Sequence, residues 1–401
     1  MSISRRDALA AAALAVPATA HTADAASRFP FRVTRNCPWT LVQLKGYEPH
    51  LPFVLDTGAS SFAILKSKAS ELNLPLLDRG QARNLGLQLD LTLYRAQLVV
   101  GGALQENDAY MVGLPGVLPQ KMQGLIPPTR FGVMGFDFDA QEVTISRRTI
   151  QALDGYHALD LDPGETDSVS MDNMGARSRS ELFEWTRDHR PVVDVELDGV
   201  KLKLLIDTGA SLGIYLHAHY VKKVGLWDRN ASAPSQTLHV VGGSLQAHLI
   251  RAERLKLGNV VFSKPVVALG DPAIGEKGVG KTIDGVIGME FLRRLNFVHD
   301  PQRRRFWIKP NKAIADGYRY DRAGAYVEFV DGAGRVTSLW PGSPADRAGL
   351  RLNDKITGWR GRDGIEGLAW AMMGAPGSTV EIQVEREGKL QMVAVTLEEQ
   401  I

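Results

Sequence analysis

Two aspartates in identical surroundings are the residues best suited to chemistry in this chain. The sequence Asp-Thr-Gly-Ala-Ser occurs at residues 56–60 and again at residues 207–211, each time directly after three apolar residues. A single copy is typical of an ordinary turn. Two copies predict that an internal duplication brings Asp56 and Asp207 together, and paired carboxylates that share a proton can activate water.

The segments that follow the two motifs also look alike. Gly-Val-Met-Gly stands at residues 132–135 and Gly-Val-Ile-Gly at residues 285–288. The motifs are offset by 207 − 56 = 151 residues and the glycine segments by 285 − 132 = 153 residues. We therefore interpret the chain as two copies of one unit, with the two glycine segments as counterparts.

Within each copy the pattern favours short β-strands. Residues 192–197 partly alternate in polarity, Asp198-Gly199 offers a turn, and an apolar run over 202–206 leads into the second motif. This is the pattern of a hairpin that ends at the motif. Each copy has one short helical candidate, over 66–72 and 217–224. The prediction is a mostly β fold.

Changes in composition mark the boundaries between these units. A polar stretch rich in Gly, Ser and Asp runs from about 162 to 180, and a second boundary falls near 310–320. The predicted organisation is a signal peptide (1–25), a first lobe (30–150), a linker or long loop (151–185), a second lobe (186–312) and a C-terminal domain (320–401).

The N-terminus has the features of an export signal. Arg5-Arg6 precedes a weakly apolar stretch over 8–20, and small-x-small sites lie at 18–20 and 23–25. A twin-arginine signal, an ordinary secretory signal and an alanine-rich helix of a cytosolic protein all remain open. The stretch is too short to span a bilayer comfortably. We expect a periplasmic or secreted protein without a transmembrane segment in its mature form.

Bulk composition excludes some classes of function. The chain has 401 residues, of which 44% are hydrophobic, and a net charge of +2. There is no basic stripe interleaved with aromatics, so nucleic acid is not an expected partner. The single cysteine, Cys37, cannot form an intramolecular disulfide and is expected to be a buried structural thiol.

With these motifs placed, residues 30–310 resemble the pepsin-like and retropepsin-like aspartic proteases. In those proteins each lobe supplies one Asp-Thr-Gly loop, and an apolar-apolar-Gly segment crosses behind it. The run GVIGMEFLRRL at 285–295 is similar to bacterial retropepsin-like proteins. The resemblance implies two retropepsin-like β-barrel lobes that form a pseudo-dimer within one chain.

The last segment resembles a different family. Residues 320–401 are similar to the PDZ domains attached to bacterial periplasmic proteases, on the strength of SPADRAGL at 343–350 and NDKI at 353–356. This resemblance implies a small β-barrel with helices that binds a peptide by strand addition. Its carboxylate-binding loop is expected at Gly324, Ala325 and Tyr326. A docking or structural domain without a ligand is the alternative.

The protease resemblance assigns roles to the motif residues. Asp56 and Asp207 would be the catalytic pair, holding one proton between them and activating water without a metal or cofactor. Thr57 and Thr208 would hydrogen-bond across the interface. Gly58 and Gly209 would let the backbone approach the carboxylates.

Two further features of the family can be placed. Ala59 and Ala210 stand where pepsins often carry a serine that hydrogen-bonds the carboxylate, which predicts a less acidic pH optimum than pepsin's. A β-hairpin flap is expected at Gly242 and Gly243 in the second copy and at Gly86 in the first, with Tyr94 near the place of a flap tyrosine. Whether there are one or two flaps stays open.

The two histidines His217 and His219, close together in sequence, suggest a metal site. No third ligand has suitable spacing, so we interpret them as surface histidines.

The sequence thus predicts an aspartic endopeptidase whose PDZ domain recruits a substrate or partner. Its partners would be a peptide or protein substrate and a peptide ligand of the PDZ domain. A monomer is expected, since one chain supplies both aspartates. The alternative is a catalytically silent peptide-binding protein that uses the cleft and the PDZ domain for recognition only.

Overall fold

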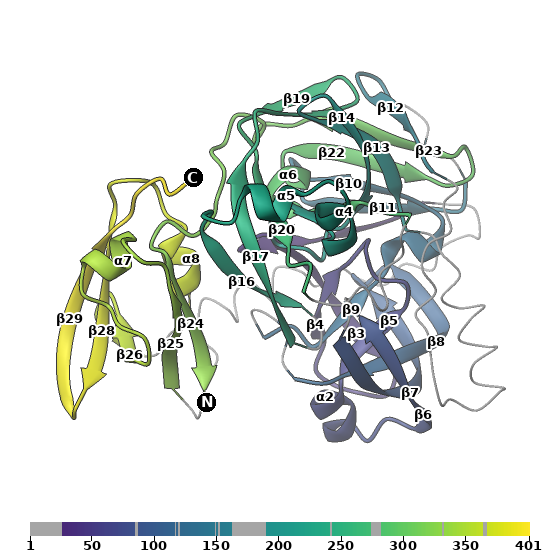
Figure 1. Ribbon diagram of the computed structural model, residues 1–401. Coiled ribbons are helices and arrows are strands. Elements are labelled where there is room, and N and C mark those ends of the chain that lie inside the picture. Colours follow the sequence, from purple (N-terminus) through teal and green to yellow (C-terminus); the bar gives the residue numbers. More distant parts are fainter. Residues whose placement is uncertain are drawn as a thin grey trace.

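The computed structural model describes residues 26–84, 87–116, 118, 121–148, 150, 153–162, 190–240, 243–273, 282–330, 333–363 and 367–401. The signal-peptide prediction and most of the 151–185 linker lie outside these ranges. The described chain forms four β-sheets with short helices between them, which confirms the mostly β fold (Figure 1). No helix in this part of the chain is long and apolar enough to cross a membrane.

An eight-stranded sheet carries the first motif. Its order is β2-β3-β4-β9-β5-β8-β7-β6, and the first motif follows β4. Helix α2 (Lys66–Glu71) follows β5. The strands are β2 (Arg32–Thr34), β3 (Cys37–Leu44), β4 (Leu51–Leu55), β5 (Phe62–Leu65), β6 (Leu76–Asn84), β7 (Leu87–Val100), β8 (Leu104–Leu114) and β9 (Gly124–Ile126).

A nine-stranded sheet, ordered β16-β17-β20-β15-β21-β14-β13-β18-β19, carries the second motif after β14. The helices beside it are α4 (Ala218–Lys223), α5 (Leu226–Arg229) and α6 (Met289–Leu292). The strands are β13 (Val192–Leu197), β14 (Val200–Ile206), β15 (Ile214–Leu216), β16 (Ser235–Val240), β17 (Gly243–Arg251), β18 (Arg254–Leu257), β19 (Val260–Ser263), β20 (Val266–Gly270) and β21 (Gly285–Ile287).

The strand pairing corrects the internal repeat. β21 runs parallel to β14 and antiparallel to β15, and in the first sheet β9 has the same relation to β4 and β5. Asp207 N donates to Ile287 O at 3.0 Å and Asp56 N to Ile126 O at 2.8 Å. The counterpart of Gly285–Ile287 is therefore Gly124–Ile126, and the pairing with residues 132–135 was wrong. Gly-apolar-apolar is too short a signature to tell these two glycine segments apart.

Residues 132–135 instead lead into a sheet that joins the two halves. It is ordered β1-β11-β10-β22-β23-β12, and β10 pairs antiparallel with β22 across 161–165 residues of sequence. The rings of Phe136 and Phe297 stack across this pair, with centroids 5.0 Å apart. The 3₁₀ helix η2 (Pro128–Phe131) precedes β10. The strands are β1 (Ser27–Pro30), β10 (Val133–Asp137), β11 (Glu142–Ser146), β12 (His157–Asp160), β22 (Leu295–Asp300) and β23 (Arg305–Pro310).

The C-terminal unit, residues 320–401, has its own sheet and its own core. Figure 1 shows it beside β16 and β17 of the nine-stranded sheet. Its elements are β24 (Ala325–Val330), β25 (Ala333–Leu339), α7 (Pro344–Arg347), β26 (Lys355–Trp359), β27 (Arg362–Asp363), α8 (Leu368–Met372), β28 (Thr379–Arg386) and β29 (Lys389–Thr396).

An apolar seam fixes the C-terminal unit to the β16–β17 hairpin. Trp340 and Tyr320 pack in one cluster with Leu238 and Leu245 of the hairpin. The Trp340 indole N–H donates to the carbonyl of Ser235, where β16 begins. The seam therefore buries aromatic surface, and the indole N–H of Trp340 still has a hydrogen-bond acceptor.

Charged contacts extend the seam at the end of β17. The Arg251 guanidinium donates to a Glu399 carboxylate oxygen at 2.8 Å and to Ile401 O at 3.0 Å. The C-terminal residues of the chain are thus bonded to the hairpin of the second sheet.

A buried ion pair lies where both halves and the C-terminal connection meet. Glu290 and Arg294, on and just after α6, are both almost fully buried and pair at 2.9 Å. The other Glu290 oxygen accepts from Asn36 Nδ2 at 2.7 Å, and Arg319 N donates to the first at 3.1 Å. Each charge is thus compensated inside the protein, as burial requires.

Removing one member of this pair should destabilise the whole fold. We expect Glu290→Ala to lower the free energy of unfolding by about 3–5 kcal/mol, because it leaves the Arg294 guanidinium buried without its partner. Glu253→Ala is the matched control, since its pair with Lys264 is exposed and should contribute less than about 1 kcal/mol. Urea unfolding measures both, and equal losses would contradict the role given to Glu290.

Candidate active site

The two Asp-Thr-Gly-Ala-Ser loops meet at the interface between the two sheets. The Thr57 hydroxyl donates to Ile206 O at 2.7 Å, and the Thr208 hydroxyl donates to Leu55 O at 2.6 Å. Each hydroxyl also accepts the other threonine's backbone N–H at 3.0 Å. Both threonines are fully buried. These four bonds lock the two loops together across the interface, where the sequence predicted a threonine contact.

The glycines lie where no side chain could fit. A Cβ added to Gly58 would overlap the carboxyl group of Asp207, and one added to Gly209 would overlap that of Asp56. Each glycine therefore covers the carboxyl group of the opposite half. This close approach explains in physical terms why glycine follows each Asp-Thr pair.

Backbone amides hold each carboxylate in place. Asp56 Oδ1 accepts from Gly58 N at 2.9 Å and from Ala59 N at 2.8 Å. Asp207 Oδ1 accepts from Gly209 N at 2.8 Å, and Ala210 N lies at 3.2 Å. One oxygen of each group is thus engaged by its own loop, which leaves the other for its partner or a ligand.

The two carboxyl groups lie within hydrogen-bonding reach of each other and cannot both ionise cheaply. Burial raises the pKa of Asp56 well above its ordinary value, and the charge of Asp207 adds to this. Burial also raises the pKa of Asp207, but its loop amides, a hydrogen bond from Asp56 and the positive charge of Arg190 oppose the rise. The pair therefore retains a shared proton.

Cys37 is a buried structural thiol, as the sequence predicted. Burial and then the negative charge of Asp56 raise its pKa to about 12. It packs with Val54 and Met122 in a small apolar cluster. A thiol with so high a pKa is not a nucleophile at neutral pH.

Hairpins stand at the positions expected for flaps in both halves. β6 pairs with β7 and β16 with β17, with tips next to Asn84 and Val240. Gly86 and Gly242 lie outside the described residues, and Gly243 begins β17. Tyr94 lies at the base of its hairpin, paired with Leu76, and its ring packs in the core. The placement of Tyr94 near a flap tip was therefore wrong, because β7 extends far beyond the hairpin turn.

The loop expected to receive a peptide carboxylate in the C-terminal unit already holds one. Ala323 N and Gly324 N donate to Asp321 Oδ1 at 2.9 and 3.1 Å, and the Ala325 amide also stabilises this carboxylate. Burial raises the pKa of Asp321 to about 6 against these amides. Tyr326 follows in β24. Of the amides that the sequence assigned to a ligand, those of Gly324 and Ala325 are thus bonded to the chain's own side chain.

The surface interpretation of His217 was wrong. Its ring is buried, Nδ1 lies 3.0 Å from Ile283 O, and burial lowers its pKa to about 4. The ring of His219 is 5.8 Å away. The described residues contain no group of three His, Cys, Asp or Glu side chains that could hold a metal ion. His217 therefore acts as a neutral core histidine.

Sequence reasoning missed the residues that support the second loop. Asn36 donates to Ser211 O at 3.1 Å, at the end of the second motif, as well as to Glu290. Nothing in the sequence ties Asn36 to a segment 175 residues away. Glu290 did carry a signal, since it is an acidic residue inside the apolar run after the second glycine segment.

Comparison with known proteins bears on the second half of the chain. Residues 193–291 match the family model described as aspartyl protease, a span that contains the second motif, Glu290 and β21. No curated protein matches the chain. The match supports a retropepsin-like aspartyl protease domain in the second half of the chain, and with it peptide hydrolysis.

Proposed function

We propose that the protein is an aspartic endopeptidase whose catalytic pair is Asp56 and Asp207, one from each of two lobes in a single chain. The observation that carries the proposal is the reach of the two carboxyl groups to each other inside a locked interface. An aspartyl protease match over the second half supports the same reaction class. Because one chain supplies both aspartates, a homodimer is not required.

The environment of the pair suggests a division of labour. Asp207, nearer the positive charge of Arg190, is the ionised member and takes a proton from water. Asp56 holds the shared proton and donates it to the scissile carbonyl oxygen. The water then attacks the carbonyl carbon and forms a tetrahedral intermediate without a covalent link to the enzyme. Collapse of this intermediate breaks the peptide bond, as Asp207 passes its proton to the leaving amine nitrogen and a hydroxyl of the intermediate returns a proton to Asp56.

The alternative is a protein that keeps the cleft for peptide recognition without turnover. Loops splayed apart at Thr57 and Thr208 would favour it. The four bonds between these threonines and the opposite strands hold the loops closed, which favours the enzyme.

Export and substrate recruitment complete the proposal. We place the protein in the periplasm or outside the cell, on the features of residues 1–25. We also propose that the C-terminal unit is a PDZ domain that recruits a substrate or partner peptide. Asp321 lowers the affinity of its loop for a terminal carboxylate, because a second negative charge would have to share amides that already bond to the first.

Replacing either aspartate should abolish cleavage. We expect Asp207→Asn and Asp56→Asn each to lower kcat/KM by about 10²–10⁴-fold, the usual contribution of a general acid or base. Asp108→Asn, in an exposed pair with Arg95, is the matched control and should leave the rate unchanged. Cleavage of a peptide library measures all three. Cleavage that survives in both site variants, or that wild type never shows, would refute the protease.

Arg190 should set the acid limb of the pH–rate profile. Its positive charge favours the ionised form of Asp207, so Arg190→Gln should raise that pKa and move the acid limb of kcat/KM to higher pH, by roughly half a unit. Arg190→Lys keeps the charge and should keep the limb in place. An acid limb that is the same in Arg190→Gln and wild type would remove Arg190 from the mechanism.

Asp321 should oppose carboxylate binding to the C-terminal unit. Asp321→Asn removes the buried charge but keeps an oxygen for the two amides, so a peptide with a free C-terminus should bind about tenfold tighter than to wild type. The same peptide with an amidated terminus is the control and should bind both proteins alike. Fluorescence anisotropy of a labelled peptide measures these affinities, and no gain for the free acid would contradict the proposed competition.

A further inference from the structure

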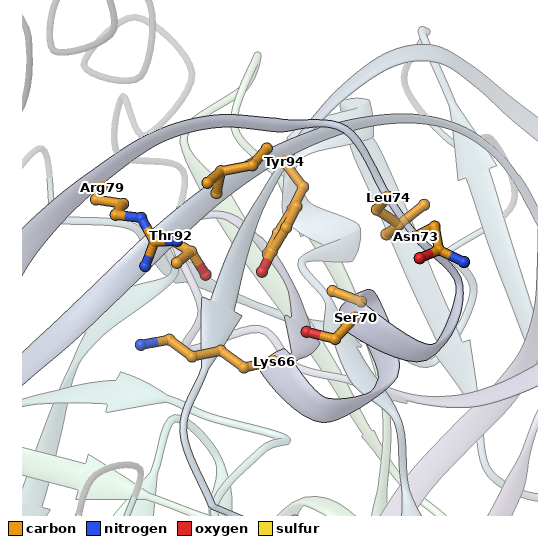
Figure 2. Close-up of a pocket in the computed structure, with 9 residues that line it drawn as sticks. Lys66, Ser70, Asn73, Leu74, Arg79, Thr92 and Tyr94 are labelled. Atoms are coloured by element: carbon orange, nitrogen blue, oxygen red, sulfur yellow. The ribbon is translucent and has the colours of Figure 1, made fainter.

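A hollow of about 500 Å³ lies between α2 and the base of the β6–β7 hairpin. Figure 2 shows the side chains of Lys66 and Ser70 facing those of Thr92 and Tyr94 across it. None of the Asp-Thr-Gly-Ala-Ser residues lines this space. It is therefore separate from the catalytic pair.

The two faces of β7 separate the hollow from the pair. Leu91 packs with Val112 in an apolar cluster, and Leu118 and Leu125 connect that cluster to the one around Cys37 near Asp56. Thr92 and Tyr94 line the hollow. Because neighbouring side chains of a strand point to opposite faces, the hollow opens on the side of β7 away from the catalytic pair.

The charge of the hollow is positive. Lys66 and Arg79 line it, and none of its described lining residues carries a carboxylate. Lys66 Nζ donates one hydrogen bond to Asp90 O at 2.5 Å, which leaves two N–H donors of the ammonium group for a ligand. The nearby acids are engaged elsewhere, Glu71 with Lys68 and Asp90 with Gln81. An anionic group is the natural complement.

A buried hydroxyl also lacks a partner here. Thr92 is buried, and its Oγ1 makes no hydrogen bond. It lies against Gly113 of β8, where any Cβ would overlap it. An unsatisfied buried hydroxyl is costly, and a rotation of χ1 would offer it to an acceptor in the hollow.

Apolar side chains form another part of the lining, beside the polar Ser70 and Asn73, and they call for more than a small ion. Leu74 and the Tyr94 ring form its buried wall, and Leu76 is exposed at its edge beside Leu77. In the described part of the eight-stranded sheet, β6 is the edge strand, so its outer backbone can accept a further strand. An extended peptide meets all of these features.

We propose that this hollow is a secondary binding site for an extended peptide that carries a carboxylate side chain. The carboxylate lies between Lys66 and Arg79, and a neighbouring apolar side chain packs on Leu74, Leu76 and Tyr94. The peptide backbone pairs with the edge of β6. The inference deepens the proposed protease, because such a peptide would be part of a substrate held away from the catalytic pair.

Binding can be tested without turnover. The probe is a fluorescein-labelled peptide, Ala-Leu-Glu-Leu-Ala with both ends blocked, measured by anisotropy against the full-length Asp207→Asn variant. Its matched control carries Gln in place of Glu. We expect the Glu peptide to bind at least about tenfold tighter than the Gln peptide, and Lys66→Met with Arg79→Met to remove that difference.

Lys201→Met is the control variant, since Lys201 is an exposed lysine of β14 in the other half of the molecule. It should bind as the parent does. Arg79→Met alone changes an exposed position and should leave the fold intact. A weaker preference for the Glu peptide in this single variant shows that the effect in the double variant is not due to misfolding. Equal binding of the Glu and Gln peptides, or an unchanged preference in the double variant, would overturn the site. The outcome is independent of catalysis, so a failure of the protease proposal would be seen separately in the cleavage assay.

Discussion

Two carboxyl groups held against each other are the constraint on which the rest of this structure depends. Burial raises the pKa of both Asp56 and Asp207, and the charge of Asp207 raises the pKa of Asp56 further. The protein therefore has to fix the two loops from outside the pair. The reciprocal threonine bonds do this, since each hydroxyl donates to the opposite strand and accepts from the opposite loop. These bonds are buried and give the hydroxyl and the backbone N–H of both Thr57 and Thr208 a partner.

The rest of the interface between the two halves also serves to hold the two loops in place. The β10–β22 pair joins the halves by backbone hydrogen bonds, and the main apolar core continues from one half to the other. Glu290 adds a polar tie, because it connects α6, Asn36 of the first half and the segment leading to the C-terminal unit. A buried ion pair of this kind adds little net stability, but it penalises any arrangement in which one partner is lost. It therefore restricts the ways in which the halves can pack.

The residues of the site were easier to predict from the sequence than the strands and side chains that hold them in place. The duplicated motif predicted that the aspartates, threonines and glycines of the two copies meet, because two identical copies imply two loops related by near-symmetry. The partner strand of the first motif was misassigned, since β9 repeats only a glycine and two apolar residues. Burial of His217 and the contact of Asn36 with Ser211 depend on tertiary packing. The sequence also did not predict that Asp321 occupies the loop of the C-terminal unit. This contact depends on the orientation of a single side chain in the folded protein.

The two halves share the same strand arrangement, but different contacts support their hairpins and loops. This difference affects how the site could respond to ligands. The β16–β17 hairpin is fixed by Trp340 at its start and by Glu399 and Ile401 at Arg251. Helix α6 with Glu290 supports the second loop, whereas η2 occupies the equivalent place in the first half. The β6–β7 hairpin has β6 at a sheet edge and a hollow at its base. β16 is also an edge strand, but the C-terminal unit packs against it. A ligand at the base of the β6–β7 hairpin would give the first half a contact comparable to the one that the C-terminal unit gives to the second.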